Sequence, residues 1–307
     1  MIRKDLYQNT VIRSTIFFEY AIGILGNAIL LLFHILIFLL EHNPKPTDLP
    51  IGLLALTHLA MLITAAIIAT DILMFWEGFW GDITCKSLVY LHRFIRALSV
   101  CITCLLSVLQ AITLSPRNSW LAKFKSKSPH HYLCSVLVLW VFYMLANSHI
   151  FLSVIGTPNF TSSNLVYVSK SCSVCPISHT LRQVFSTLLT LREVFLMGLM
   201  FLSSGHMALL LCRHKRRSRH LHRTSLSPNA SPEQRATRTI LLLMSFFLVM
   251  SILFYSIHVS RIMWNDDPIL FYILILVGHI YATVSPLVLI SADKRVIIFV
   301  RTMCGRE

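Results

Sequence analysis

Seven long apolar stretches constrain what this chain can fold into more than any other feature of its sequence. They cover about 17–40, 51–75, 85–114, 132–155, 186–212, 237–263 and 269–291. A helix needs about 20 mainly apolar residues to cross the hydrocarbon of a bilayer, and every stretch is long enough. Because backbone polar groups in lipid must find their partners within the protein, the pattern predicts seven transmembrane helices.

The composition agrees with a lipid environment. Of the 307 residues, 55% are hydrophobic and 13% are charged, whereas soluble domains carry about 25% charged residues. The connections between the stretches are short, so no soluble domain remains. We therefore expect a single all-α membrane domain over 1–307, a seven-transmembrane helix bundle that ends in a short cytoplasmic tail over 292–307.

Lys and Arg are distributed unevenly between two alternating sets of connections. One set contains 16 of them, in 41–50, 115–131, 213–236 and 292–307. The other set contains 5, in 1–16, 76–84, 156–185 and 264–268. Cytoplasmic loops carry the excess of positive charge, so the count predicts an N-terminus outside the cell and a cytoplasmic C-terminus. The basic residues of 1–16 alone favour the reverse orientation, but we follow the count over the whole chain.

A formal net charge of +14 can indicate nucleic acid binding. Here the basic residues lie in short loops and not on one face of a folded domain. We therefore expect them to contact membrane lipid, and we expect no nucleic acid partner.

Three cysteines fall on the predicted outer side. Cys85 opens the third stretch, and Cys172 and Cys175 lie in the second outer loop. In the oxidising exterior, a bridge between Cys85 and one of these two would tie the loop over the mouth of the bundle; the alternative is a free thiol at each position. No second CxxC or HxxxH pair accompanies them on this side, so we expect no metal site.

Two sequons test the orientation. Asn159-Phe160-Thr161 lies in the second outer loop, and Asn229-Ala230-Ser231 lies in the third inner loop. Under the assigned orientation only Asn159 can be glycosylated.

Ionisable side chains inside the apolar stretches are the candidates for a ligand site, because they are costly in lipid and usually face the interior of a bundle. Arg93 and Arg96 in the third stretch, and Arg192 and Glu193 in the fifth, are the clearest cases. Arg96 and Glu193 lie at about the same depth in their helices. We expect them to pair and, with Arg93, to set the polarity of a ligand pocket. The alternative is that Arg192 and Glu193 only reach out to the lipid headgroups.

Histidines also occur at membrane depth, namely His58, His206, His258 and His279. Such residues could form a proton relay, but isolated histidines that hydrogen-bond neighbouring helices are commoner. We include His279 among the candidate ligand contacts.

The predicted inner side carries the candidates for contact with a cytoplasmic partner. A basic run from Arg213 to Arg219 opens the third inner loop. Such a run is most often an orientation determinant that contacts anionic lipid, and it can also dock a partner; the candidate contacts are Arg117, Lys215, Arg216 and Arg217. After the last stretch, 293–302 predicts a short amphipathic helix on the inner leaflet, with Cys304 available for palmitoylation.

Enzyme signatures are missing from the sequence: HExxH, GxSxG, a P-loop and a carboxylate pair within a stretch. We expect neither catalysis nor a cofactor. No internal repeat or pair of interrupted spans is visible, which counts against a transporter. From the residues alone, a receptor is favoured over a polytopic channel or transporter, and both over a structural membrane protein.

Three long strings resemble the vomeronasal type-1 receptors, a family of pheromone-detecting G protein-coupled receptors. The first is CITCLLSVLQAITLSPRNSW from Cys101, continued by LAKFKSKS. The second comprises LREVFLMGLMFLSSGHMALLLCRHKR from Leu191 and SPNASPEQRATRTILLL from Ser227. The third is HIYATVSPLVLISADKRV from His279. The resemblance covers essentially the whole chain. Bitter taste receptors are the nearest alternative among receptors.

The resemblance implies that Cys85 and Cys172 form the outer disulfide, that Asn159 is glycosylated, and that Cys175 is an extra cysteine. It also implies that a small extracellular cue shifts the inner ends of the helices, so that an inhibitory-class G protein exchanges nucleotide.

Compared with rhodopsin-like receptors, Gly26-Asn27 is similar to the usual pair in the first span. Leu114-Ser115-Pro116-Arg117 replaces the acidic-Arg-aromatic triplet of the third span, Ser285-Pro286 replaces an Asn-Pro pair, and His58 takes the place of a sodium-binding aspartate. The usual ionic lock and sodium site are therefore not expected.

Overall fold

The computed structural model describes the residues 2–40, 47–70, 82–116, parts of 134–148, 154–156, 166–167, 172–174, 179–221, 232–263 and 268–304. Its long helices are α1 (Ile2–Leu40), α2 (Asp48–Thr70), α3 (Asp82–Leu114), α6 (His179–Leu221), α7 (Pro232–Met263) and α8 (Pro268–Ala292). Each of these six contains a segment long and apolar enough to cross a membrane. A short helix, α9 (Lys294–Cys304), follows α8.

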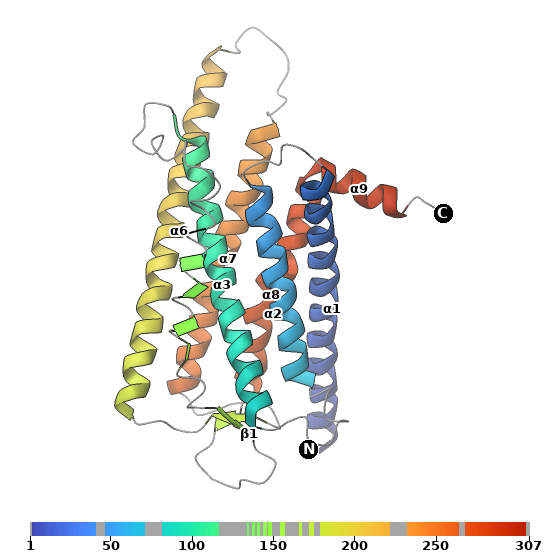
Figure 1. Ribbon diagram of the computed structural model, residues 1–307, viewed down its shortest axis with the longest axis vertical. Helices are drawn as coiled ribbons and strands as arrows, with labels where there is room; N and C mark the ends of the chain where they lie inside the picture. Colours follow the sequence, from blue (N-terminus) through green and yellow to red (C-terminus); the bar gives the residue numbers. More distant parts are fainter. Residues whose placement is uncertain are drawn as a thin grey trace.

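The long helices form one bundle (Figure 1). In it α1 packs against α2 and α8, α3 packs against α2 and α6, and α7 packs against α6 and α8. The start of α1 lies at the end of the bundle that also carries a small β-sheet, and α9 lies at the opposite end, at an angle to the bundle (Figure 1). We call these the sheet end and the α9 end.

The fourth apolar stretch is helical where it is described, at positions between Cys134 and Leu145, and a turn follows at Asn147 and Ser148. The Ser148 hydroxyl and amide both donate to the Leu145 carbonyl, and the Tyr90 hydroxyl of α3 donates to the Met144 carbonyl at 2.9 Å. These bonds satisfy carbonyls at a helix end, where no further turn supplies donors.

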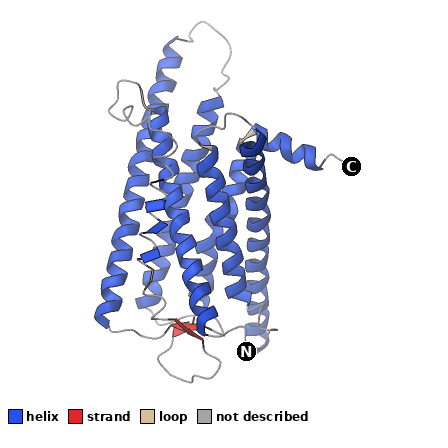
Figure 2. Cartoon of the chain, in the orientation of Figure 1, coloured by secondary structure: helices blue, strands red, loops and turns tan. Residues whose placement is uncertain are grey.

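The expected helical span over 132–155 is therefore wrong at its end. Its last residues belong to strand β1 (Val154–Gly156), which is antiparallel to β3 (Cys172–Val174), and β3 also pairs with β2 (Val166–Tyr167). The three strands form a sheet in the order β1-β3-β2, at one end of the bundle (Figure 2). β-branched Val154 and Ile155, just ahead of a glycine, suit a strand better than a helix end.

The first helix is much longer than the apolar stretch 17–40, because α1 already begins at Ile2. No proline or glycine occurs before Gly23 to end a helix in this part of the sequence. The helix therefore extends through most of the segment 1–16, which lies ahead of the first predicted membrane span.

Glycines on α1 allow the helices to approach closely. A Cβ on Gly23 would lie 2.6 Å from Leu62 Cδ1 of α2 and 2.7 Å from Thr283 Oγ1 of α8. Large apolar side chains are exposed on the outward faces, for example Phe17, Leu25 and Phe201. In water such surface would be unfavourable, and in a bilayer it faces hydrocarbon. Polar residues such as Asn27, His58 and Thr103 are buried inside the bundle.

Candidate functional site

A polar cluster lies in the sheet-end half of the bundle, around Arg96 of α3. The guanidinium carbon of Arg96 stands 3.8 Å from the centre of the Phe254 ring of α7. A Cβ on Gly278 of α8 would lie 3.2 Å from both Arg96 Nη1 and Phe254 Cε2. The glycine thus leaves room for the stacked pair, and such a contact contributes about 2 kcal/mol when it is desolvated.

Two histidines and a tyrosine continue this cluster toward α1 and α2. The His279 ring of α8 lies 5.4 Å from the His92 ring of α3 and 5.4 Å from the Tyr20 ring of α1. Thr64 of α2 hydrogen-bonds His92 Nδ1 at 3.1 Å. His279 Nδ1 lies 2.8 Å from the Ile275 carbonyl oxygen, to which it must donate. The neutral ring then presents Nε2 as an acceptor, and this buried atom has no partner among the described residues.

The expected ion pair between Arg96 and Glu193 is not formed. Among the described side chains, Glu193 pairs with its neighbour Arg192, and Tyr255 of α7 lies nearby. Arg96 lies within electrostatic range of Glu193, but stacking on Phe254 keeps its guanidinium on the α7 and α8 side.

The alternative, in which Arg192 and Glu193 reach out to the headgroups, does not hold either. Their side chains are only 16% and 11% exposed. Arg93, by contrast, is exposed on α3 and lies outside the stack, within electrostatic range of Arg96. The structure therefore gathers Arg96, Glu193 and His279 near one another and leaves Arg93 at the margin.

Glu19 of α1 was not among the candidate residues. Both of its carboxylate oxygens are inaccessible to solvent and have no hydrogen-bond partner in the described part of the chain. It precedes Tyr20, which lies within electrostatic range of Glu19 and of Arg96. The signal that could have found it is the single acidic residue inside the first apolar stretch.

The sheet lies next to the start of α3. Cys85, in the first turns of α3, is buried and disulfide-bonded. Strand β1 packs against α3, and Cys172 on β3 is paired in register with Gly156 of β1. The side chains of Cys172 and Cys175 lie outside the described residues, so the partner of Cys85 stays a prediction.

At the α9 end, Arg295 ties α9 to the start of α2. Its guanidinium donates to Asp48 at 3.0 Å and to Asp293 at 3.1 Å, while Asp293 also caps α9 by accepting from the Arg295 amide at 2.9 Å. Burial alone would lower the pKa of Arg295, but the hydrogen bonds and charges of Asp48 and Asp293 outweigh it and raise the pKa above its ordinary value. Sequence reasoning missed this contact, because Asp48 and Arg295 are 247 positions apart.

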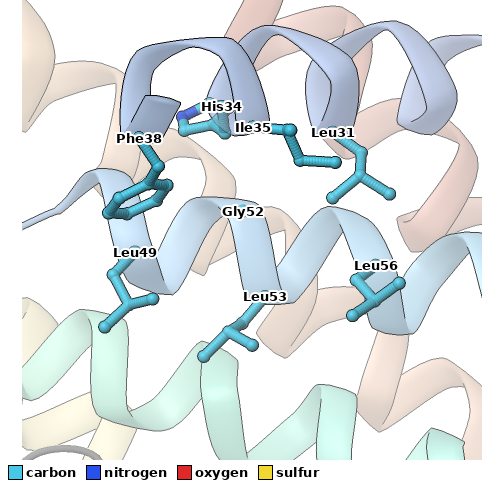
Figure 3. A pocket seen from close by; sticks show the side chains of 8 residues that line it. All are labelled: Leu31, His34, Ile35, Phe38, Leu49, Gly52, Leu53 and Leu56. Atoms are coloured by element: carbon cyan, nitrogen blue, oxygen red, sulfur yellow. The ribbon is translucent and has the colours of Figure 1, made fainter. Parts of the chain in front are cut away.

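A cavity of about 120 Å³ lies between α1 and α2 toward the α9 end (Figure 3). It is lined by Leu31, His34, Ile35, Phe38, Leu49, Gly52, Leu53 and Leu56. Apart from His34, the lining is apolar, and Ile35, Phe38 and Leu56 are exposed. This groove opens onto the outer surface of the bundle, where lipid chains lie, and it is separate from the Arg96 cluster.

The comparisons with known proteins identify the family. The model of the vomeronasal organ pheromone receptor family matches residues 10–302. The chain is 56% identical to the rat protein vomeronasal type-1 receptor 94 over 301 residues, which are 98% of this chain and 92% of the relative. It is 54% identical to mouse vomeronasal type-1 receptor 47 over 299 residues, 97% of this chain and 96% of the relative.

The chain belongs to the vomeronasal type-1 receptor family. It is therefore a pheromone-sensing G protein-coupled receptor with seven transmembrane helices, a multi-pass membrane protein and not an enzyme. Membership of this family implies a small-molecule ligand and a G protein as partners.

Several candidate residues of this vomeronasal receptor cannot be placed. Asn159 and Arg117 lie outside the described residues, as does the second sequon at Asn229. Lys215, Arg216 and Arg217 belong to α6, but their side chains are not described. For the cysteine-rich outer loop and the basic inner loop, the roles assigned from the sequence stay predictions.

Proposed function

We propose that this vomeronasal receptor binds its cue in the Arg96 cluster, through Arg96, Glu193 and His279, with Arg93 at the rim. The observation that carries this proposal is the state of Arg96. It lies at membrane depth, yet it has no hydrogen bond or ion pair to any described side chain and only stacks on Phe254. An intramembrane charge without a partner is a functional site by default.

His279 Nε2 gives the site a hydrogen-bond acceptor of fixed direction. It lies within the same cluster, and it suits a hydroxyl or amine hydrogen on the cue. A ligand that makes these contacts more strongly in the active arrangement shifts the population toward it, because only differential affinity moves such an equilibrium.

The sheet end faces the outside in this proposal, and the α9 end faces the cytosol. The count of Lys and Arg in the connections supports this orientation. In the same arrangement Cys172 is the partner of Cys85, Asn159 carries the glycan, and Arg117 with Lys215, Arg216 and Arg217 contacts a G protein of the inhibitory class.

The experiment uses cells that express the receptor with a calcium reporter and a cyclic AMP reporter, screened with urine fractions and steroid-like odorants. The fraction that activates wild type is then applied to Arg96→Gln and His279→Phe at matched surface expression. We expect at least a tenfold loss of potency in each, about 1.4 kcal/mol. Ser256→Ala is the control, since Ser256 is exposed on α7 beside Tyr255 and bonds only its own helix.

Unchanged potency in both variants would mean that the cue binds at another site.

For the G protein, ADP-ribosylation of inhibitory α subunits is expected to abolish the fall in cyclic AMP. A response that survives this treatment contradicts the assignment to the inhibitory class and leaves the ligand site untouched.

The disulfide is tested with single cysteine variants. Cys172→Ser is expected to lose surface expression as Cys85→Ser does, whereas Cys175→Ser keeps it. The reverse pattern would assign the bridge to Cys175.

A further inference from the structure

The groove between α1 and α2 contains one polar side chain, which the proposed ligand site does not use. His34 lines this groove and is only 3% exposed. Its Nδ1 lies 2.8 Å from the Leu30 carbonyl oxygen, to which it must donate. The neutral ring then presents Nε2 as an acceptor, and this atom has no hydrogen-bond partner in the part of the chain that the structure describes.

Gly52 of α2 lies opposite His34 on the other wall of the groove (Figure 3). A Cβ on Gly52 would lie 3.3 Å from His34 Cβ and 3.8 Å from His34 Cγ, and it would meet no other described residue within 4 Å. The glycine thus keeps open a space beside the histidine ring that a larger residue would fill.

The size of the groove indicates that it holds only one end of a larger molecule. Its volume is about 120 Å³, whereas pockets that enclose a whole drug-sized ligand measure about 300–1,000 Å³. Beyond the groove lie Ile35, Phe38 and Leu56, which are 45%, 42% and 47% exposed. On a membrane-spanning bundle these side chains face hydrocarbon. The occupant is therefore a lipid whose polar end reaches His34.

The charges next to the groove restrict what that polar end can be. His34 lies within electrostatic range of Asp48, Asp293 and Arg295, two carboxylates that hold one guanidinium between them. This group carries more negative than positive charge, so it repels a phosphate or a carboxylate. A cationic head would lose its hydration against the apolar lining at high cost. A neutral hydroxyl can donate to His34 Nε2 and brings no charge into the groove.

We propose that the groove binds the hydroxyl end of a membrane sterol, which donates a hydrogen bond to His34 Nε2 while its rings lie along Leu31, Ile35 and Leu53. The single hydroxyl of a sterol is joined directly to flat apolar rings, whereas the acyl chain of a phospholipid has no donor for the histidine. A rigid ring system also loses less conformational freedom on binding than an acyl chain. This site is independent of the cue and of the G protein.

The experiment uses the full receptor, purified and placed in phosphatidylcholine nanodiscs that contain cholesterol with a photoreactive diazirine. After illumination, crosslinked peptides are identified by mass spectrometry. We expect crosslinks in 31–38 and 49–56, and few in 249–253 of α7. The latter is the matched control surface, since Val249, Ile252 and Leu253 are 54%, 60% and 45% exposed.

Competition with unlabelled sterols tests the hydrogen bond. Cholesterol is expected to displace the probe from 31–38 and 49–56. Its methyl ether has the same rings but no hydrogen to donate, so we expect it to compete about tenfold less well, which corresponds to about 1.4 kcal/mol. Equal competition by the two compounds in wild type would show that the groove holds an apolar group only, and would overturn the assignment to a hydroxyl.

His34→Phe removes the acceptor and keeps an aromatic ring. We expect about tenfold weaker binding of the probe at 31–38 and 49–56, and no remaining difference between cholesterol and its methyl ether. Leu253→Phe on the control surface is expected to behave like wild type. If His34→Phe does not fold, Leu56→Trp replaces it, because this change covers the groove from its exposed rim and removes no hydrogen bond.

Two outcomes would overturn the site itself. Crosslinks spread over 31–38, 49–56 and 249–253 in proportion to their exposure would show general contact with lipid and no groove. Crosslinking of 31–38 and 49–56 that is unchanged in His34→Phe, or in Leu56→Trp where that variant replaces it, would mean that the sterol lies outside the groove.

Discussion

At the scale of single residues, the polar interior of this receptor is defined by groups that stay unsatisfied. Arg96 stacks on an aromatic ring instead of pairing with Glu193, and Glu19 has both carboxylate oxygens buried without a partner among the described residues. Charged groups in such surroundings are costly unless something binds them. These groups therefore lower the stability of the receptor while they serve ligand binding, and substitutions can separate the two effects.

Phe254 holds the guanidinium of Arg96 in place, so its substitution is expected to change ligand response more than stability. Phe254→Leu removes the ring face, worth about 2 kcal/mol when desolvated, and leaves the arginine free to swing toward Glu193. We expect a loss of cue potency at unchanged surface expression, measured with the cyclic AMP reporter. Phe254→Tyr keeps the ring face and is expected to respond like wild type. Equal potency in the Leu variant would mean that Arg96 is not positioned by this ring.

Glu19→Gln is expected to stabilise the receptor. The buried carboxyl is either ionised without a partner or must take up a proton, and both cost free energy that a neutral amide does not. We expect a higher midpoint in thermal unfolding of the purified protein without cue. A lower midpoint would show that Glu19 has a stabilising partner.

At the scale of elements, close helix packing and one ion pair decide how the bundle is assembled. Gly23 allows α1 to touch α2 and α8, and Arg295 connects α9 to α2 and Asp293. Because hydrocarbon competes equally well for apolar side chains, close contact and polar bonds are what hold membrane helices together.

Gly23→Ala is expected to destabilise the bundle, because its Cβ would lie 2.6 Å from Leu62 Cδ1 and 3.2 Å from the Thr283 Cα. Overpacking of this kind costs about 1–3 kcal/mol, and we expect lower thermal stability and lower surface expression. Gly198→Ala is the matched control, since nothing lies within 4 Å of a Cβ there. A Gly23 variant as stable as the Gly198 variant would argue against this packing.

The Asp48–Arg295 pair is expected to show a coupling free energy of about 0.5–3 kcal/mol in a double-mutant cycle of Asp48→Asn and Arg295→Leu. The pKa of Arg295 is raised in the folded protein, so its contribution is complete below the ordinary pKa of arginine and is lost only above it. Thermal unfolding should therefore show the same coupling across the neutral pH range. Additive single effects would mean that α9 is held by other contacts, such as Phe33 against Phe299.

At the scale of the whole molecule, the bundle separates its chemistry by depth. The Arg96 cluster lies between α3, α7 and α8, and the Arg295 contacts join α9 to the start of α2. Helix α9 lies at the end of the bundle opposite the start of α1 (Figure 1). A signal between the two ends would therefore have to pass through the packed helices between them.

The orientation of the bundle is tested by its two sequons. We expect Asn159→Gln to remove a glycan and shift the mobility of the protein on a gel, and Asn229→Gln to have no effect. An epitope tag on the N-terminus should be accessible on intact cells, and a tag within 222–231 only after permeabilisation. A glycan on Asn229 would reverse the orientation and, with it, the sides assigned to cue and G protein.

The sequence alone determined that the chain crosses a membrane as helices, because the thickness of the hydrocarbon sets the length of apolar stretch that is needed. It also pointed to Arg96, Glu193 and His279, since ionisable residues stand out in such stretches. It did not predict where helices end when no proline or glycine marks the place, as at the start of α1, nor that Val154 belongs to a strand.

Only the tertiary structure decided which polar groups meet. Glu193 pairs with Arg192 and Arg96 stacks on Phe254, so Glu193 and Arg96 do not form an ion pair with each other. Asp48 pairs with Arg295, which lies near the other end of the sequence. These outcomes depend on how helices rotate and approach one another, which is set by small residues such as Gly23 and Gly278 and by packing over the whole bundle. Periodicity and hydropathy carry no information on these contacts, because they describe each helix against lipid and not against its neighbours.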